Sequence, residues 1–248
     1  MLRRTTSVIA ALLCCSFMLS AHAESGLASF EIVSGDLPPF ADQHNATHPG
    51  ALVELVELLT QKLKQPNKVQ FFPWARAIAT AQSQNRVAIL PFTRTPEREA
   101  QFTWLVKLYA QRFVAIRYRA PVIDKLEQLR GLRIAVLRGS PTHMFLIRNH
   151  FKPELIQAEA KNENMLKALD HGLVDVIYGS EQINLEVIKK SGRKLSDYHF
   201  GAMLDQGEIW LAGGKGFSSE DIRVLNAAME ALQKDGNYDQ VMKKYGLK

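Results

Sequence analysis

The sequence contains only two cysteines, Cys14 and Cys15, and both lie within the first 23 residues. Two early arginines, an apolar stretch over 8–19 and an Ala-x-Ala site at 21–23 are typical of a secretory signal peptide, which we expect to be cleaved before Glu24. Lipidation of a cysteine is the alternative, but leucines precede Cys14, where small residues are preferred. A mature periplasmic chain would therefore have no disulfide, no thiol catalysis and no cysteine-ligated zinc.

Other absences narrow the function further. After residue 23, no apolar run is long enough to cross a membrane. The charges are interspersed, and loss of the two early arginines lowers the net charge from +6 to about +4, so nucleic acid is not an expected partner. The sequence has no Gly-x-Ser-x-Gly elbow, His-Glu-x-x-His helix or glycine-rich phosphate loop. We therefore expect neither an enzyme nor a cofactor. We also expect no metal site, because the pair His44 and His48 beside Asp42 is typical of a solvated loop.

Strand-like and helix-like segments alternate along the chain. β-rich runs at 30–35, 68–72 and 87–92 enclose helical patterns at 52–63 and 74–84. A second series has strands at 132–137, 154–159 and 174–179, with helices at 142–150, 162–170 and 181–190; a strand at 207–214 and a helix from Ser218 follow. This order predicts an α/β fold of two lobes, each a mostly parallel sheet flanked by helices. We expect lobe 1 at 24–118 and 206–248, lobe 2 at 119–205, and hinge crossings near Arg119 and Asp205.

The end of the third lobe 1 strand has the composition of an anion receptor. Thr95 precedes Pro96, a pair that suits the cap and first position of a helix, whose free N–H groups attract anions. Arg98 would lie in the first turn, where its guanidinium can bind a carboxylate through two N–H groups, and Thr93 can add a hydroxyl. The alternative is a simple capped turn. Arg94 is expected to be solvated or in a surface ion pair.

A similar corner follows the first strand of lobe 2. There Gly139 permits a tight turn, Ser140 can cap a helix and Pro141 can start it, with Thr142 next. Two such corners, one per lobe, can face each other across a cleft, because ligands in α/β sheets bind at the carboxyl ends of strands and between domains.

Further candidates lie at the same strand ends, and each has a structural alternative. Phe40 and Trp74 would line the cleft or pack in the core. Arg76 would point into the cleft or pair with Glu97 or Glu99. After the strand at 174–179, the candidates are Tyr178, Ser180 and Glu181, the last of which is also an ordinary acidic helix start.

Five stretches, taken in order, resemble the bacterial extracellular solute-binding proteins of family 3, the amino-acid type that serves ABC importers. They are DLPPF (36–40), TRTPEREAQFTW (93–104), LEQLRGLRIAVLRGS (126–140), ALDHGLVDVIYGS (168–180) and ALQKDGNYDQVMKKYG (231–246). The resemblance implies a type II periplasmic-binding-protein fold, closure of the lobes on a small ligand, a monomer, and an ABC permease as partner. It also implies that Arg98 clamps an α-carboxylate with help from Thr93, that Ser140 and its neighbours add contacts, and that Phe40 stacks on the ligand.

One departure from the family pattern affects the expected ligand. Where amino-acid binders usually carry an aspartate for the α-ammonium, this sequence has Ser180, with Glu181 next to it. The resemblance therefore leaves three ligand classes open: an amino acid, a carboxylate without an amine, or another small polar solute. Two alternatives to transport also stay open. One is a dehydratase-like enzyme using Glu181 or a histidine, and the other is a sensor whose closed form contacts a membrane receptor.

Overall fold

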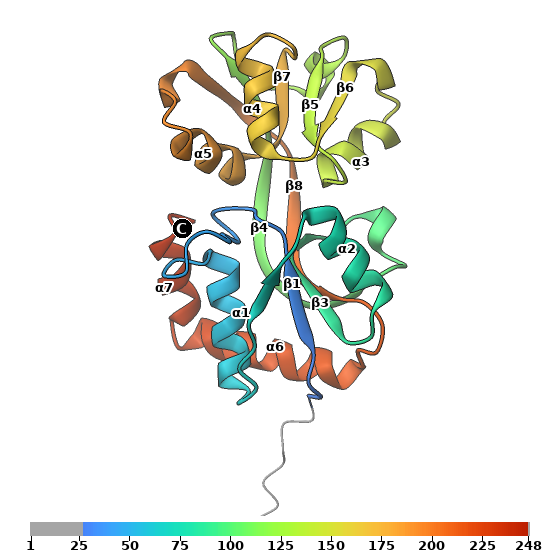
Figure 1. Ribbon diagram of the computed structural model, residues 1–248, viewed down its shortest axis with the longest axis vertical. Helices are drawn as coiled ribbons and strands as arrows, with labels where there is room; N and C mark the ends of the chain where they lie inside the picture. Colours follow the sequence, from blue (N-terminus) through green and yellow to red (C-terminus); the bar gives the residue numbers. More distant parts are fainter. Residues whose placement is uncertain (1–26, 248) are drawn as a thin grey trace, which may run out of the picture.

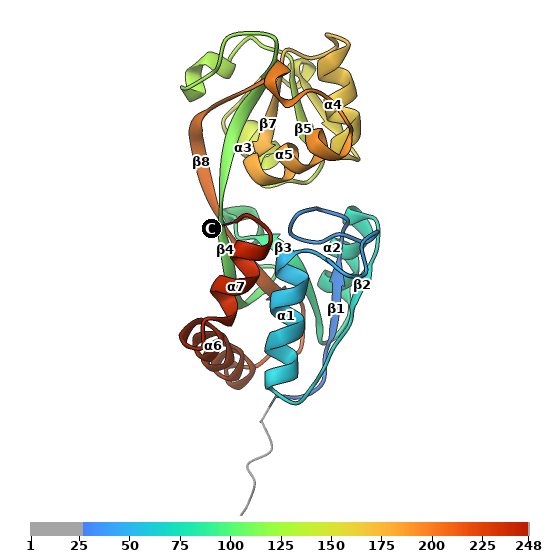
Figure 2. The same cartoon turned by 90° about the vertical axis from the view of Figure 1, so that its left-hand side faces the viewer.

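Two lobes, one above the other, are joined by two long strands, as Figures 1 and 2 show for the computed structural model. The structure describes residues 27–247, so the expected signal peptide lies outside the described residues. The joining strands are β4 (Thr103–Tyr118) and β8 (Tyr198–Gly213), which pair antiparallel along most of their length. The predicted two-lobed α/β fold is confirmed.

Lobe 1 combines a small parallel sheet with four helices. Strand β1 (Glu31–Ser34) lies between β2 (Val69–Phe71) and β3 (Val87–Thr93) and is parallel to both. The helices are α1 (Ala51–Lys62), α2 (Trp74–Ser83), α6 (Ser219–Lys234) and α7 (Asn237–Lys244). Helix α1 buries its leucine and valine stripe, as its periodicity predicts, and α6 begins with a capping box between Ser218 and Asp221.

Lobe 2 repeats the arrangement. Strand β5 (Ile134–Leu137) is parallel to β6 (Ile156–Glu159) and β7 (Val176–Ser180). The helices are α3 (Pro141–Arg148), α4 (Asn162–Asp170) and α5 (Glu181–Lys190). Short 3-10 turns lie at Leu126–Leu129, Pro153–Leu155 and Leu195–Asp197. Successive residues of β5 pack on opposite faces: Ile134 and Val136 contact the core under α3, and Ala135 the core under α4 and α5.

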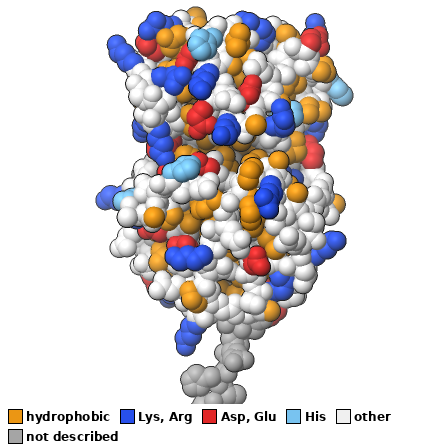
Figure 3. Space-filling model, viewed as in Figure 1, with side chains coloured by type: hydrophobic (Ala, Val, Ile, Leu, Met, Phe, Trp, Pro, Cys, Tyr) orange, Lys and Arg blue, Asp and Glu red, His pale blue; other side chains and the backbone are white. Residues whose placement is uncertain are grey.

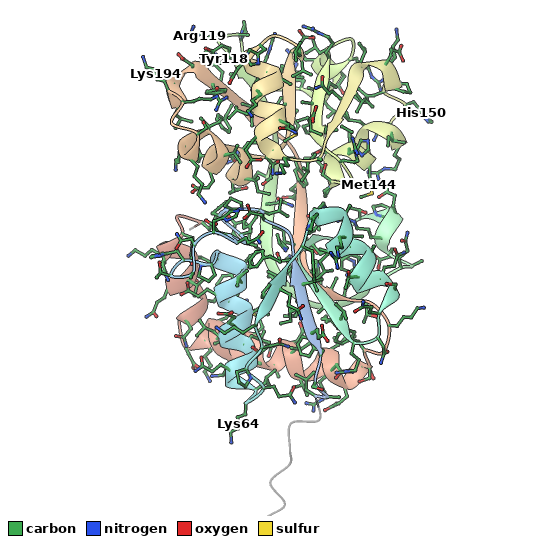
Figure 4. All side chains as sticks on the ribbon, in the orientation of Figure 1. Lys64, Tyr118, Arg119, Met144, His150 and Lys194 are labelled. Carbon is green, nitrogen blue, oxygen red and sulfur yellow. The ribbon has the colours of Figure 1, made fainter. Side chains whose placement is uncertain are left out.

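The strands form one continuous sheet in the order β2-β1-β3-β8-β4-β7-β5-β6. The antiparallel pair at its centre leaves lobe 1 where Gln111 lies opposite Gly207, and β4 begins to pair with β7 at Phe113. We had expected the first crossing near Arg119, but Figure 4 shows Arg119 at the outer end of lobe 2. The difference arises because β4 does not end between the lobes but continues as a strand of lobe 2. On β8 the same point lies at Gly207, two residues from Asp205.

The glycine at the second crossing has a steric role. A Cβ on Gly207 would lie 2.8 Å from Thr93 and 2.8 Å from Phe113, closer than real side chains approach. Gly207 therefore lets β8 pass directly against two residues from different lobes.

Candidate functional site

A cavity lies between the two lobes, at a position where α/β proteins of two domains commonly bind small ligands. Apolar side chains are visible in the seam between the lobes in Figure 3. Both lobes contribute to the cavity, through the ends of β3, β5 and β7, the loop after β1, the starts of helices and the crossing strands β4 and β8. The lining residues are Leu37, Phe40, Trp74, Pro91, Thr93, Arg98, Gln111, Phe113, Leu137, Ser140, Pro141, Thr142, Asn162, Met165, Gly179, Ser180, Ile183, Asn184 and Ile209.

The Arg98 corner follows directly from the end of β3. Thr95 is extended, and Pro96 begins a 3-10 turn that ends at Arg98. The helix expected here is only this one turn, because the chain enters β4 at Thr103. Thr95 makes no side-chain cap, so the expected capping interaction is absent from this turn. The anion attraction of a helix N-terminus is lost, but the charge of Arg98 stays in place, with a side chain only 5% exposed.

The Arg98 guanidinium is held from both lobes. Nη1 donates to the carbonyl oxygen of Thr93 at 2.7 Å, and Nη2 donates to that of Gly139 in lobe 2 at 2.8 Å. The guanidinium also lies over the ring of Phe92, with its carbon 4.0 Å from the ring centroid. These contacts fix the guanidinium at the cavity wall without neutralising it.

Burial sets the electrostatics of this corner. It lowers the pKa of Arg98 to about 9, opposed by the negative charge of Glu97 on the neighbouring residue. Arg98 is thus a cation at neutral pH, and it is the only charged residue that lines the described cavity. A buried charge without a counterion is costly.

A pair of polar side chains adjoins the Arg98 corner. Gln111 is 4% exposed, and its Nε2 donates to Thr93 Oγ1 at 2.7 Å. Gln111 Oε1 is buried and has no hydrogen-bond partner among the described residues. Sequence reasoning missed Gln111, because a single glutamine inside a long strand has no motif. It reaches the cavity only because β4 crosses between the lobes at this residue.

The lobe 2 corner has the expected cap. Ser140 Oγ accepts from the backbone N–H of His143 at 3.2 Å and lies 3.0 Å from Thr142 Oγ1. Thr142 is 2% exposed and lines the cavity with Ser140. The hydroxyl groups of these two residues thus face the Arg98 corner from the opposite lobe.

The carboxyl end of β7 adds a third polar group. Ser180 is buried, lines the cavity, and its Oγ has no hydrogen-bond partner in the described chain. Its carbonyl oxygen accepts from Nδ2 of Asn184, one turn into α5, at 2.8 Å. Asn162, the first residue of α4, is also buried at the wall. The two asparagines were not predicted, although both lie on helices that follow strands ending at this edge.

Of the other candidates, Phe40 and Trp74 line the cavity, whereas Tyr178, Glu181 and Arg76 do not. Tyr178 is fully buried on the α3 side of the sheet, where its ring centroid lies 6.0 Å from that of Phe145, and burial raises the pKa of its hydroxyl. Tyr178 shares this face of β7 with Val176, two residues earlier, and both pack in the core under α3.

The two charged candidates are engaged elsewhere. Glu181 forms an ion pair with Arg112, with Oε2 3.2 Å from Nε. Arg76 is exposed and lies over the ring of Phe72 at 4.9 Å, pairing with neither of the glutamates considered for it. Arg94 forms a surface ion pair with Glu99, with Nη2 and Oε1 2.5 Å apart, which was one of its two expected states.

A second, outer cavity adjoins the first and shares Leu37, Trp74, Leu137 and Asn162 with it. Its empty volume is about 1280 Å³, and its wall carries the charged or titratable residues Asp36, His44, Lys161 and Glu163. Acidic groups are therefore present at this outer cavity and absent from the wall of the inner one.

Neither a metal-binding cluster of acidic, histidine or cysteine side chains nor a membrane-spanning helix occurs in the part of the chain that the structure describes. Across residues 27–247, no group of three or more histidine, cysteine, aspartate or glutamate side chains is placed to hold a metal ion. None of the helices in that range is long and apolar enough to span a membrane.

Known proteins with similar sequences bind solutes. The histidine-binding periplasmic protein of Escherichia coli K12 is 26% identical over 226 residues, covering 85% of each chain. Its counterpart in Salmonella typhimurium is 26% identical over 241 residues, covering 91% of each.

The fold is also found in solved structures. An ancestral arginine-binding protein bound to glutamine superimposes with a TM-score of 0.75 at 20% identity, over 90% of this chain and 100% of that one. A histidine kinase sensor domain with similarity to periplasmic binding proteins gives a TM-score of 0.78 at 18% identity, over 87% and 95%. The model of the bacterial extracellular solute-binding proteins, family 3, matches residues 32–248, and the chain therefore belongs to this family.

Proposed function

We propose that this protein is a periplasmic solute-binding protein that captures a small carboxylate-bearing ligand, an amino acid or a related acid, and delivers it to an ABC importer. The observation that carries the proposal is Arg98, a buried cation without a counterion on the wall of a cavity between two lobes. A ligand carboxylate supplies that counterion through charge-assisted hydrogen bonds. Family membership and the histidine-binding relatives support the transport role.

Closure of the two lobes on the ligand would change the outer surface of the protein, which a partner can recognise. Arg98 already contacts lobe 2 at Gly139, and two further ion pairs join the lobes: Arg148 with Glu97, and Lys190 with Asp42. A ligand that contacts both walls favours the closed arrangement over an open one. The closed outer surfaces would then be recognised by the permease.

The enzyme alternative has less support. Glu181, its candidate acid or base, is paired with Arg112 outside the cavity, and no aspartate, glutamate or histidine lines the described inner wall. A pair of positioned proton-transfer groups is the minimum for such chemistry.

A thermal-shift screen of the purified protein against amino acids, organic acids, polyamines and sugars tests the proposal. A ligand at 100 times its Kd adds about 2.7 kcal/mol of stability, which is readily measured. A carboxylate is expected to give the largest shift. Stabilisation by sugars or polyamines but by no carboxylate would reject the proposed anchor.

A further inference from the structure

We propose that the preferred ligand is a 2-hydroxy acid with an apolar substituent rather than an α-amino acid. The inference rests on the proposed function and specifies its ligand class. It combines the charge of the inner cavity with the polar atoms that this cavity leaves without partners.

The charge balance of the inner cavity excludes a second cation. An α-ammonium group is bonded to the carbon next to the carboxylate, so it must lie in the inner cavity once Arg98 holds that carboxylate. With a zwitterionic amino acid bound, the cavity would keep the net charge of Arg98, because no aspartate or glutamate lines it. With a 2-hydroxy acid bound, the guanidinium and carboxylate cancel. A closed cavity favours the ligand that brings the total charge of Arg98 and ligand to zero, since an unpaired buried charge is costly.

Two acidic residues, Asp42 and Glu181, lie close in sequence to residues that line the inner cavity. Each of them already pairs with a cationic side chain, so neither is available to an ammonium group. Asp42 follows Phe40 by two residues and lies 2.5 Å from Lys190 Nζ. Glu181 follows Ser180 and is paired with Arg112. Asp36 and Glu163 line the outer cavity beyond Leu37 and Trp74. Asp205 lines a separate hollow that shares Thr93, Phe113 and Pro141 with the inner cavity, but it is not on the inner wall.

Three polar atoms of the inner cavity lack a partner among the described residues: Gln111 Oε1, Ser180 Oγ and Trp74 Nε1, the last of which can only donate. The first two fit a hydroxyl group. Gln111 Oε1 can only accept a hydrogen bond, and Ser180 Oγ can both donate and accept. Both residues line the inner cavity and are more than nine-tenths buried, at 4% and 7% exposure. Gln111 contacts Thr93, whose carbonyl oxygen is bonded to Arg98, so the free Oε1 belongs to the carboxylate corner. A ligand hydroxyl can donate to Gln111 and accept from Ser180, whereas a 2-oxo group cannot donate.

Apart from Ser140, Thr142 and two asparagines, most of the remaining wall is apolar. Leu37, Phe40, Phe113, Met165, Ile183 and Ile209 face the same space. An aliphatic substituent on the ligand would be desolvated against these side chains, which is favourable in proportion to its buried area.

Isothermal titration calorimetry with matched acids tests the inference. The comparison uses L-2-hydroxyisocaproate, L-leucine, 2-oxoisocaproate and isocaproate, together with lactate and alanine as a smaller pair. The hydroxy acid is expected to bind at least tenfold more tightly than its amino acid and its oxo acid. Tighter binding of leucine or of the oxo acid would overturn the inference while leaving the proposed function intact. If no carboxylate in the set binds, both fail.

Two variants make the assignment specific to this site. Ser180→Asp adds the missing negative charge and should shift the preference toward leucine by at least tenfold, and Ser180→Asn, which has nearly the same size without the charge, should give a much smaller shift. Gln111→Met removes the acceptor at similar volume, so isocaproate and the hydroxy acid should then bind within about threefold of each other. Melting temperatures within a few degrees of the parent would show that both variants fold. An unchanged amino-acid to hydroxy-acid ratio in Ser180→Asp would contradict the proposal.

Discussion

The Arg98 side chain of lobe 1 donates a hydrogen bond from Nη2 to the carbonyl oxygen of Gly139 in lobe 2, across 2.8 Å. Gly139 has a φ of +72° in the turn before α3, a conformation that glycine adopts without strain. The guanidinium that we propose as the anion anchor therefore also links the lobes. In this proposal, ligand binding and lobe closure are coupled at one side chain.

Replacement of Arg98 by alanine should weaken binding of a carboxylate ligand by about 2–5 kcal/mol, because the ligand charge would then be buried without a partner. Calorimetry measures the loss. Arg94→Ala is the matched control, since Arg94 is four residues away, pairs with Glu99 on the surface and does not line the cavity. Equal affinities of the two variants would reject Arg98 as the anchor.

Carboxylate affinity should depend on pH through Arg98. Its pKa in the free protein is about 9, and a bound anion raises it further, because the anion stabilises the protonated guanidinium. Affinity is therefore full below pH 9 and falls as the pH rises above it, by up to about tenfold per unit. Titrations from pH 7 to pH 10.5 measure the effect. A constant affinity over that range would show that the free guanidinium does not titrate there.

The lobe-to-lobe ion pairs should tune closure without contacting the ligand. Lys190 and Arg148, which pair with Asp42 and Glu97, are partly exposed, so each pair contributes about 0–1 kcal/mol. Lys190→Ala and Arg148→Ala are expected to lower ligand affinity up to about fivefold and to increase the radius of gyration of the free protein in small-angle X-ray scattering. Lys189→Ala, at the exposed neighbouring position, provides the control. If all three variants scatter alike, these pairs do not hold the lobes together.

Folding stability of lobe 1 should depend on Arg86. Its guanidinium pairs with Asp221, which is 2% exposed and caps α6, at 3.0 Å. Arg86→Ala leaves that carboxylate buried without its cation and should cost about 3–5 kcal/mol in urea unfolding. The control is Arg223→Ala on the same helix, whose exposed pair with Glu220 should contribute less than about 1 kcal/mol.

The same pair makes stability sensitive to acid. Burial alone would raise the pKa of Asp221, but hydrogen bonds from Arg86 and Ser218 outweigh it and leave the pKa below its ordinary value of 3.8. Its contribution is thus present above about pH 4 and is lost as the pH falls through the lowered pKa. Unfolding curves at pH 7 and pH 3 should show a smaller acid loss in Asp221→Asn than in the parent. An equal loss would mean that other carboxylates govern acid unfolding.

Local patterns were enough to predict most of the elements and part of the site. The strand and helix order gave the two lobes, and the capped turns at the ends of β3 and β5 identified Thr93, Arg98, Ser140 and Thr142, all of which line the cavity. Local patterns could not separate two residues on one strand face. Tyr178 is covered by the core under α3, and only Ser180, at the end of the strand, reaches the inner wall.

The sequence by itself determined the fold class, the family and the single buried cation, because these depend on hydrophobic period, turn residues and motif order. The tertiary structure decided which polar groups meet that cation. Gln111 reaches Thr93, beside that cation, on a strand that crosses between the lobes, and Glu181 is held outside the cavity by Arg112, 69 positions earlier in the chain. Pairings over such separations depend on strand register and lobe packing, which no local pattern encodes.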